Sequence, residues 1–270
     1  MKNLLERSIS GIIFVLVIAG LLIVHETGMF LLFLLINVLA LIEFYNLSYK
    51  NKFLPYKLPG ILSGVFIYSL AYLAASSIMQ LKFLILSILI IPALGIIPLF
   101  YKSSTVFRSW GPTILGILYV SIPLSLVPFL AFQKTNYHFE LPLGIFIIIW
   151  LFDSFAYITG SKLGRNRMLP SVSPKKTWEG AIGGLIFAAG GSILLANYFD
   201  IIEITHWIVL AILISVTGTL GDFVESALKR NSEVKDSGFL MPGHGGTLDR
   251  FDSFLFSVPF VFMYLYLVVF

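Results

Sequence analysis

The sequence predicts an all-α polytopic integral membrane protein with about nine transmembrane helices. Of its 270 residues, 58% are hydrophobic and only 12% are charged, whereas a soluble domain carries roughly 25% charged residues. The apolar residues form long runs, and a membrane-spanning helix needs about 20 of them in succession. The basic residues fall between alternate runs, as in membrane proteins with a fixed orientation.

Nine apolar runs are candidates for these spans. They cover residues 8–24, 28–47, 59–76, 82–101, 111–132, 141–160, 180–198, 206–228 and 250–270. The first run follows Lys2 and Arg7 and could be mistaken for a signal peptide. No small-residue cleavage pattern follows it, however, and a second apolar run begins almost at once, so we expect a span.

Lysine and arginine distinguish the two sides of the predicted bundle. Sixteen of the 18 lie before the first run or after runs two, four, six and eight, and only Lys82 and Lys134 lie on the other side. Because basic residues accumulate on the cytoplasmic side, we expect a cytoplasmic amino terminus and a carboxyl terminus on the opposite side. The net charge of +4 is therefore a topology signal, and we expect no nucleic-acid partner.

Acidic residues distinguish two parts of the chain. Residues 1–140 contain four of them, Glu6, Glu26, Glu43 and Glu140, and residues 141–270 contain ten. We therefore expect a membrane scaffold of about five spans over 1–140. Residues 141–270 would form a catalytic membrane domain of about four spans, with cytoplasmic-side loops at 161–179 and 229–249.

Asp153 interrupts the sixth apolar run, within WLFDSFAYITGSKLGRNR at 150–167. A carboxylate at membrane depth costs on the order of 2.5–3.5 kcal/mol on insertion scales, so it is a candidate functional residue. The alternative is a structural hydrogen bond between helices.

A second polar stretch, SVSPKKTWEGAIGG, covers 171–184. Ser173 followed by Pro174 is typical of a helix N-cap and first turn. The two lysines that follow would then lie near free backbone amides, a combination that favours phosphate. Anchoring of the chain at the cytoplasmic surface is the alternative. The glycines at 180–184 favour close helix packing. The candidate phosphate-binding residues are Ser173, Lys175, Lys176, Thr177 and Glu179.

A third group of polar residues surrounds the last two apolar runs. Their i, i+3 and i+4 spacings place acids on one helix face and then on the opening turn of the last span. Four carboxylates near one membrane boundary would repel each other unless a cation lay among them. Oxygen ligands without cysteine favour a hard ion, Mg²⁺ before Ca²⁺ or Mn²⁺. The residues are Asp222, Glu225, Ser226 and Lys229, followed by Asp249, Arg250 and Asp252.

Glycines surround His244 in the loop between these runs. Gly245 and Gly246 would allow a close backbone approach to a phosphate. An ordinary loop is the alternative. The sequence has no G-x-x-x-x-G-K-[ST] stretch, so a nucleotide would not be held by a P-loop.

The stretch SALKRNSEVKDSGFLMPGHGGTLDRFD at 226–252 closely resembles the signature of the phosphatidate cytidylyltransferase (CDP-diacylglycerol synthase) family. Every charged or polar signature position is present, and only the apolar positions Met241 and Thr247 depart from the pattern. SPKKTWEG at 173–180 and DSFAYITG at 153–160 resemble two further stretches of the family. The resemblance implies that CTP and phosphatidic acid give CDP-diacylglycerol and pyrophosphate with Mg²⁺. It also implies a homodimer in the bacterial inner membrane, with the active site facing the cytoplasm.

The resemblance and the residue chemistry together give each candidate a role. Asp222 and Asp249 are the main expected Mg²⁺ ligands. Glu225 is expected to be a further ligand, of the same ion or of a second cation. The expected catalytic residues are Asp222, Lys229, Asp249, Arg250 and Asp252. The expected substrate-binding residues are Asp153, Ser173, Lys175, Lys176, Thr177, Glu179, Ser226, Arg230, Lys235, Asp236, His244, Gly245 and Gly246.

Two other functions stay open at this point. An ion or phosphate transporter would also use acids within the membrane, but it needs access from both faces. The predicted outer side has few polar residues beyond Glu26, Glu140, Asp200 and Glu203, and we find no inverted repeat. A related membrane cytidylyltransferase that acts on an isoprenoid ether lipid phosphate is the alternative among enzymes.

Overall fold

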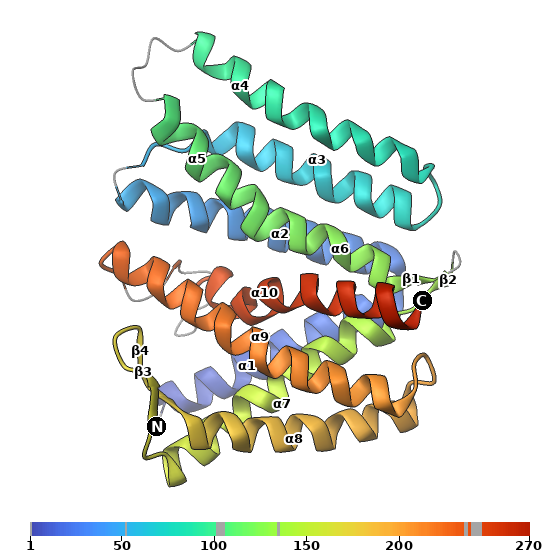
Figure 1. The fold of residues 1–270 in the computed structure, drawn as a ribbon, viewed down its shortest axis with the longest axis vertical. Coiled ribbons are helices and arrows are strands. Elements are labelled where there is room, and N and C mark those ends of the chain that lie inside the picture. The colour runs from blue at the N-terminus through green and yellow to red at the C-terminus, as the bar shows by residue number, and fades with distance from the viewer. Residues whose placement is uncertain (1, 52, 101–105, 134–135, 235–236, 239–244) are drawn as a thin grey trace. The chain divides into compact units, whose positions relative to one another are not determined.

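A computed structural model describes residues 2–51, 53–100, 106–133, 136–234, 237–238 and 245–270 (Figure 1). It describes the side chains of all these residues except 2–10, 97–100 and 106–108. The helices are α1 (Lys2–Val24), α2 (Glu26–Lys50), α3 (Lys57–Ala75), η1 (Leu81–Leu89), α4 (Ile90–Phe100), α5 (Val106–Gly116), η2 (Ile117–Ser121), α6 (Ile122–Ala131), α7 (Glu140–Leu163), α8 (Trp178–Tyr198), α9 (Ile204–Asn231), α10 (Leu248–Tyr264) and η3 (Leu265–Val269). Two antiparallel hairpins complete the fold, β1 (Phe132–Gln133) with β2 (Asn136–Tyr137), and β3 (Arg167–Leu169) with β4 (Ser173–Thr177).

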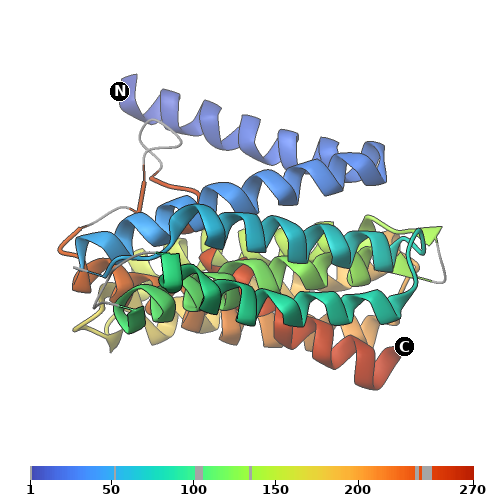
Figure 2. The same cartoon turned by 90° about the horizontal axis from the view of Figure 1, so that it is seen from above.

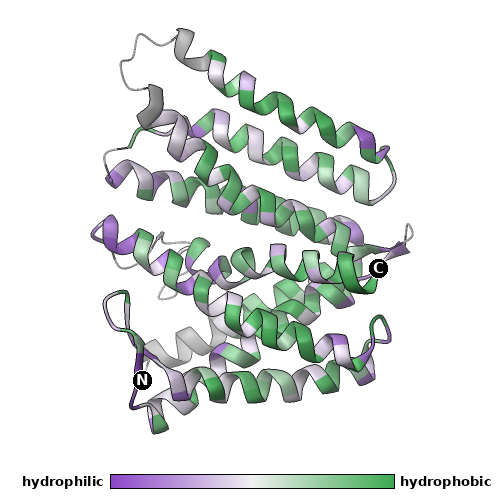
Figure 3. Ribbon diagram, viewed as in Figure 1, coloured by the Kyte–Doolittle hydropathy of each residue, from purple (hydrophilic) through white to green (hydrophobic). Residues whose placement is uncertain are grey.

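Seven helical segments of the described chain are long and apolar enough to cross a membrane. They are Glu26–Lys50, Lys57–Ala75, Ser109–Ala131, Glu140–Leu163, Trp178–Tyr198, Ile204–Asn231 and Leu248–Val269. The predicted runs 8–24 and 82–101 correspond to shorter apolar helices, Gly11–Val24 and Leu81–Ile96. Hydrophobic residues dominate the middle of the helices, and hydrophilic residues gather at several helix ends and hairpins (Figure 3). The all-α polytopic membrane fold is thus confirmed, while nine spans and the orientation of the termini stay predictions.

The chain divides into two compact units. Unit 1 contains Met1–His138 and Asn231–Arg250, and unit 2 contains Phe139–Arg230 and Phe251–Phe270. The chain therefore leaves unit 1 near the predicted boundary at 140 and returns to it for the segment between α9 and α10. The predicted division into a scaffold and a catalytic domain stays a prediction about function.

Unit 1 is built around α2. His25 caps this helix by accepting a hydrogen bond from the Thr27 amide (3.2 Å), at the turn where α1 and α2 meet (Figure 2). Within the bundle, Asn37 is fully buried, donates to the Gly64 carbonyl (3.0 Å) and accepts from the Ser121 hydroxyl (2.8 Å). These bonds satisfy a polar side chain in an apolar interior and join α2 to α3 and η2.

Unit 2 is built around the pair α7 and α8, which lie side by side (Figure 1). Glycines of α8 allow the two backbones to approach closely. A Cβ added at Gly184 would lie 2.7 Å from the Phe152 carbonyl oxygen and 2.9 Å from the Ala156 Cβ. The close packing that the glycines at 180–184 predict is therefore confirmed. In the same unit, α9 and α10 are joined by the hydroxyls of Thr217 and Ser257, 2.9 Å apart.

The glycine contacts predict a difference between two substitutions in α8. Gly184→Ala should destabilise the protein, because overpacking a tight interface costs typically 1–3 kcal/mol. Gly190→Ala is the matched control, since a Cβ there has no atom within 4 Å and alanine favours a helix by roughly 0.5–1 kcal/mol. Thermal unfolding of the purified variants in detergent measures both. Equal midpoints would contradict the assigned α7–α8 contact.

Candidate active site

The β3–β4 hairpin leads into α8 and carries the two predicted lysines. Its strands pair with Arg167 opposite Thr177 and Leu169 opposite Ser173. The Arg167 guanidinium also donates to the Lys175 carbonyl through Nη1 (3.0 Å). Thr177 then caps α8, because its hydroxyl oxygen accepts from the Gly180 amide (3.2 Å). The hairpin thus holds both lysines just before the helix begins.

The prediction that Ser173 caps a helix and Pro174 begins its first turn was wrong. Ser173 is the first residue of β4, and α8 begins at Trp178 with Thr177 as its cap. Serine and threonine are both favoured N-caps, so the sequence offers two candidates. Pairing with β3 keeps 173–177 extended, and this tertiary contact selects Thr177. A strand, not a first helical turn, therefore presents Lys175 and Lys176.

Glu179 holds the turn between α7 and β3. Its carboxylate accepts from the amides of Arg165 (3.1 Å) and Asn166 (3.1 Å) and from the Asn166 side-chain amide (2.7 Å). These bonds fix the start of the hairpin. A direct contact of Glu179 with substrate stays a prediction.

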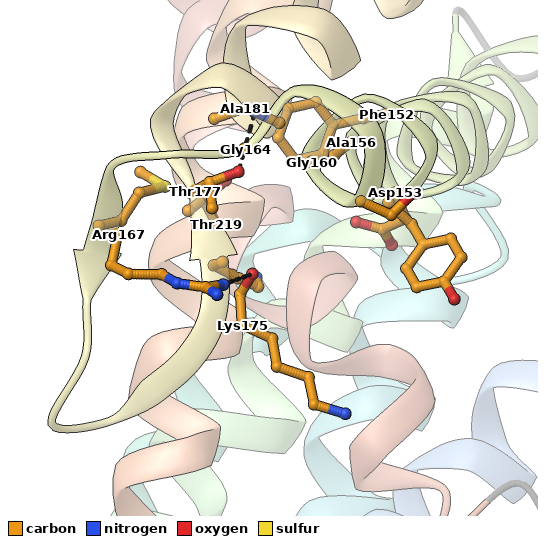
Figure 4. A pocket seen from close by; sticks show the side chains of 15 residues that line it. Phe152, Asp153, Ala156, Gly160, Gly164, Arg167, Lys175, Thr177, Ala181 and Thr219 are labelled. Carbon is orange, nitrogen blue, oxygen red and sulfur yellow. Dashed lines mark hydrogen bonds between the residues drawn. The ribbon is translucent and has the colours of Figure 1, made fainter.

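A cavity of about 500 Å³ lies between α7, the hairpin and the first turns of α8 (Figure 4). Pockets for small ligands typically have volumes of about 300–1,000 Å³. Two lysines and an arginine among its lining residues make the cavity suitable for a polyanion. Its polar lining residues include Asp153 and Tyr157 from α7, Arg167, Lys175, Lys176 and Thr177 from the hairpin, and Thr219 from α9.

Lys176 lies among the acidic residues of unit 2. Its ammonium forms an ion pair with Asp222 of α9. Burial lowers the pKa of Lys176, and the negative charges of Asp153, Asp252 and Glu225 act in the opposite direction. Carboxylates from three helices, α7, α9 and α10, therefore act on one ammonium group. The effect of burial is the larger one, so the pKa of Lys176 lies below its usual value.

The acidic face of α9 has the predicted helical spacing. Asp222, Glu225 and Lys229 lie on one continuous helix, and Glu225 is 1% exposed and ion-paired with Lys229. The Asp222 carboxylate also accepts from the Ser253 hydroxyl (2.9 Å). The backbone amide of Ser253 donates to the Asp252 carboxylate (2.8 Å). Sequence reasoning missed Ser253, although a hydroxyl directly after the signature acid is a visible signal. Of the other predicted residues, Ser226 is half-buried and Arg230 is exposed near the end of α9.

Asp249 lies in the first turn of α10 and is held by other residues of unit 1. Its Oδ2 accepts from the Ser237 amide (2.9 Å), the Ser237 hydroxyl (2.9 Å) and the Gly246 amide (2.7 Å). Gly245 has φ +80°, and a Cβ there would lie 2.7 Å from Asp249 Oδ2, so the turn requires glycine.

Neither Ser237 nor Glu43 was identified from the sequence. The Glu43 carboxylate accepts from the Thr247 and Leu248 amides (2.9 and 2.8 Å). The only signal for Glu43 was an acid within an apolar run.

Several predicted roles are not tested by these contacts. Asp222 belongs to unit 2 and Asp249 to unit 1, so their pairing around one metal ion stays a prediction. Arg250 is exposed in the first turn of α10. Three further candidates, Lys235, Asp236 and His244, lie outside the described residues.

The donor groups of the site fit a hard cation. Among the described residues, no three acidic or histidine side chains form a complete metal site by themselves. Mg²⁺ typically takes one or two carboxylates and leaves its other positions to phosphates and water. Asp222, with the Ser253 hydroxyl beside it, supplies oxygen donors only, and its ion pair with Lys176 shows that it already attracts a positive charge.

Comparison with known proteins extends the resemblance over nearly the whole chain. The model of the cytidylyltransferase family matches residues 5–268. A phosphatidate cytidylyltransferase of Staphylococcus haemolyticus is 35% identical over 259 residues, which cover 94% of this chain and 95% of that protein. One of Staphylococcus aureus is 35% identical over 260 residues, with the same coverage. One of Bacillus subtilis is 30% identical over 277 residues, 98% of each chain. The chain therefore belongs to the phosphatidate cytidylyltransferase family.

Proposed function

We propose that this membrane protein transfers the cytidylyl group of CTP to phosphatidic acid, giving CDP-diacylglycerol and pyrophosphate. The observation that carries the proposal is the cavity lined by Lys175 and Lys176, with the Lys176 ammonium paired to Asp222 at its edge. Its relatives along nearly the whole chain are named phosphatidate cytidylyltransferases. A transporter is not supported by this family membership.

The proposed reaction needs charge neutralisation more than it needs a base. An oxygen of the lipid phosphate attacks the α-phosphorus of CTP, and the bond to the bridging oxygen breaks as pyrophosphate leaves in line. A phosphomonoester has a second pKa near 6, so the nucleophile is largely ionised at neutral pH. Catalysis therefore depends on bringing two anions together and on stabilising the leaving group.

The lysines of the hairpin would supply part of that positive charge. Like unit charges 4 Å apart repel by about 4 kcal/mol at an effective dielectric of 20. Lys175 is exposed on β4, so its ammonium can reach a bound triphosphate. Lys176 is partly buried, and a triphosphate would offer it an alternative anionic partner to Asp222. Lys229 and Arg250 would hold further phosphate oxygens.

The acidic residues would hold Mg²⁺. We assign Asp222 and Asp249 as its main ligands, and Glu225, Asp252 and Asp153 as further ligands or as ligands of a second cation. When bound, the ion would polarise the phosphates and neutralise the charge that develops on pyrophosphate. Ser253 would orient the Asp222 carboxylate, since its hydroxyl donates to Oδ1.

The site would lie on the cytoplasmic side of the membrane. CTP is supplied from the cytoplasm and phosphatidic acid from the bilayer, so the reaction requires a boundary position. The lysine and arginine bias of the connections supports this orientation. We also propose a homodimer on the basis of the family resemblance.

The activity can be tested with purified protein in lipid vesicles. Labelled CTP should be incorporated into lipid when phosphatidic acid and Mg²⁺ are present, and a chelator should abolish incorporation. An isoprenoid ether lipid phosphate serves as the competing acceptor. Incorporation into that acceptor alone would overturn the substrate assignment, and no incorporation into either would overturn the proposed reaction.

Asp249→Asn tests the assigned metal ligand. Asparagine keeps the size of the side chain and one acceptor oxygen for the loop bonds, but it removes the charge. We expect normal folding and insertion with CTP-dependent turnover reduced by about two orders of magnitude or more, as for loss of a preorganised electrostatic contact. Initial rates at saturating substrates measure the effect. Turnover near that of the unchanged protein would remove Asp249 from the site.

Lys175→Ala separates phosphate binding from membrane anchoring. We expect a KM for CTP raised by about tenfold, which corresponds to roughly 1.4 kcal/mol of lost interaction, or a lower kcat. Lys162→Ala is the matched control, because Lys162 lies in the last turn of α7 and does not line the cavity. Steady-state kinetics and the accessibility of the termini to protease in sealed vesicles give the two readouts. A change in orientation alone would make Lys175 a topology anchor.

A further inference from the structure

Glu43 is a carboxylate of α2 for which the proposed reaction gives no role. It lies within the span Glu26–Lys50 and is only 8% exposed. A charged group buried at such a position is costly unless hydrogen bonds satisfy it. Its location therefore raises the question of what the charge does.

The partners of Glu43 lie about 200 residues away in sequence, in the same unit. Its Oε1 accepts from the Thr247 amide (2.9 Å), and its Oε2 accepts from the Leu248 amide (2.8 Å). Both amides are at the start of α10, where backbone N–H groups lack intrahelical partners and the helix dipole favours a negative charge. Glu43 thus acts as a cap for α10 supplied by a distant helix.

The same carboxylate is connected to Asp249 through Ser237. The Ser237 hydroxyl oxygen lies 2.9 Å from Glu43 Oε2 and 2.9 Å from Asp249 Oδ2. Asp249 Oδ2 also accepts from the amides of Ser237 and Gly246. Glu43 therefore holds the residues on both sides of the turn that orients Asp249.

We propose that Glu43 is a positioning residue for Asp249. It fixes Thr247, Leu248 and Ser237, and these fix the direction of the Asp249 carboxylate toward the cation. The inference rests on the metal role that the proposed function gives to Asp249. It assigns a function in the active site to a helix of the predicted scaffold.

Glu43→Gln tests this role. Both oxygens of Glu43 face hydrogen-bond donors, whereas glutamine has one acceptor oxygen and one donor group, so either orientation places an NH₂ against a donor. Glu43→Asp keeps the charge on a shorter side chain and should restore part of the function. Glu26→Gln is the matched control, because it removes the same charge at the other end of α2.

The experiment uses the full chain in lipid nanodiscs. In Glu43→Gln, amide hydrogen exchange at Thr247 and Leu248 should be at least tenfold faster, and the Mg²⁺ concentration for half-maximal turnover should rise at least tenfold. The KM for phosphatidic acid should change less than twofold. Glu43→Asp should lie between the two, and Glu26→Gln should match the unchanged protein. If Glu43→Gln does not fold, the intermediate values of Glu43→Asp provide the test.

An unchanged Mg²⁺ requirement in Glu43→Gln would overturn the positioning role. If the unfolding midpoint also fell and exchange became faster, Glu43 would have a purely structural role. Mn²⁺ binding without nucleotide, measured by electron paramagnetic resonance, keeps this test separate from the proposed reaction. If the unchanged protein made no CDP-lipid, weaker Mn²⁺ binding in Glu43→Gln would still support the role, and unchanged binding would refute it.

Discussion

Each charge buried in this apolar helical protein requires a partner, and the arrangement of the candidate site follows from that constraint. A carboxylate at membrane depth is costly, and an unpaired buried charge costs several kcal/mol. Asp222 and Glu225 are therefore paired with lysines, whereas Glu43 is satisfied by backbone amides. Glu179, which is not buried, is also held by backbone amides. The amide-bound acids fix the loops, and the lysine-paired acids form part of the charged cluster beside the cavity.

The two kinds of partner differ in how easily they can be exchanged. A carboxylate held by two backbone amides stabilises the backbone there. Breaking those hydrogen bonds would leave the amides of a helix start or a turn without their acceptor. An ion pair between two side chains can separate when each side chain finds a new partner of the right sign. Lys176 and Asp222 are such a pair. In the proposed function, CTP would replace Asp222 as the partner of Lys176, and Mg²⁺ would replace Lys176 as the partner of Asp222.

Local patterns were sufficient to predict most of the long helices and the acidic face. Hydrophobic run length predicts the seven long apolar segments of the described chain, although two of the nine predicted runs correspond to shorter helices. The i, i+3 and i+4 spacing predicts the face with Glu225 and Lys229. The start of α8 could not be predicted, because Ser173 and Thr177 are both good caps and strand pairing decides between them. Glu43 could not be predicted either, since its partners are separated from it by 204 and 205 residues. No periodicity in the sequence reports such a contact.

The signature at 226–252 is continuous in sequence but divided in the structure. Its first and last residues belong to unit 2, whereas the segment Asn231–Arg250 packs in unit 1. Within unit 1, the glycine turn and the start of α10 depend on an acid of α2, so the segment cannot reach its conformation from its own residues alone. A signature segment held in this way depends on α2 for its conformation. The family model covers both parts of this contact, the helix with Glu43 and the signature, since it matches residues 5–268.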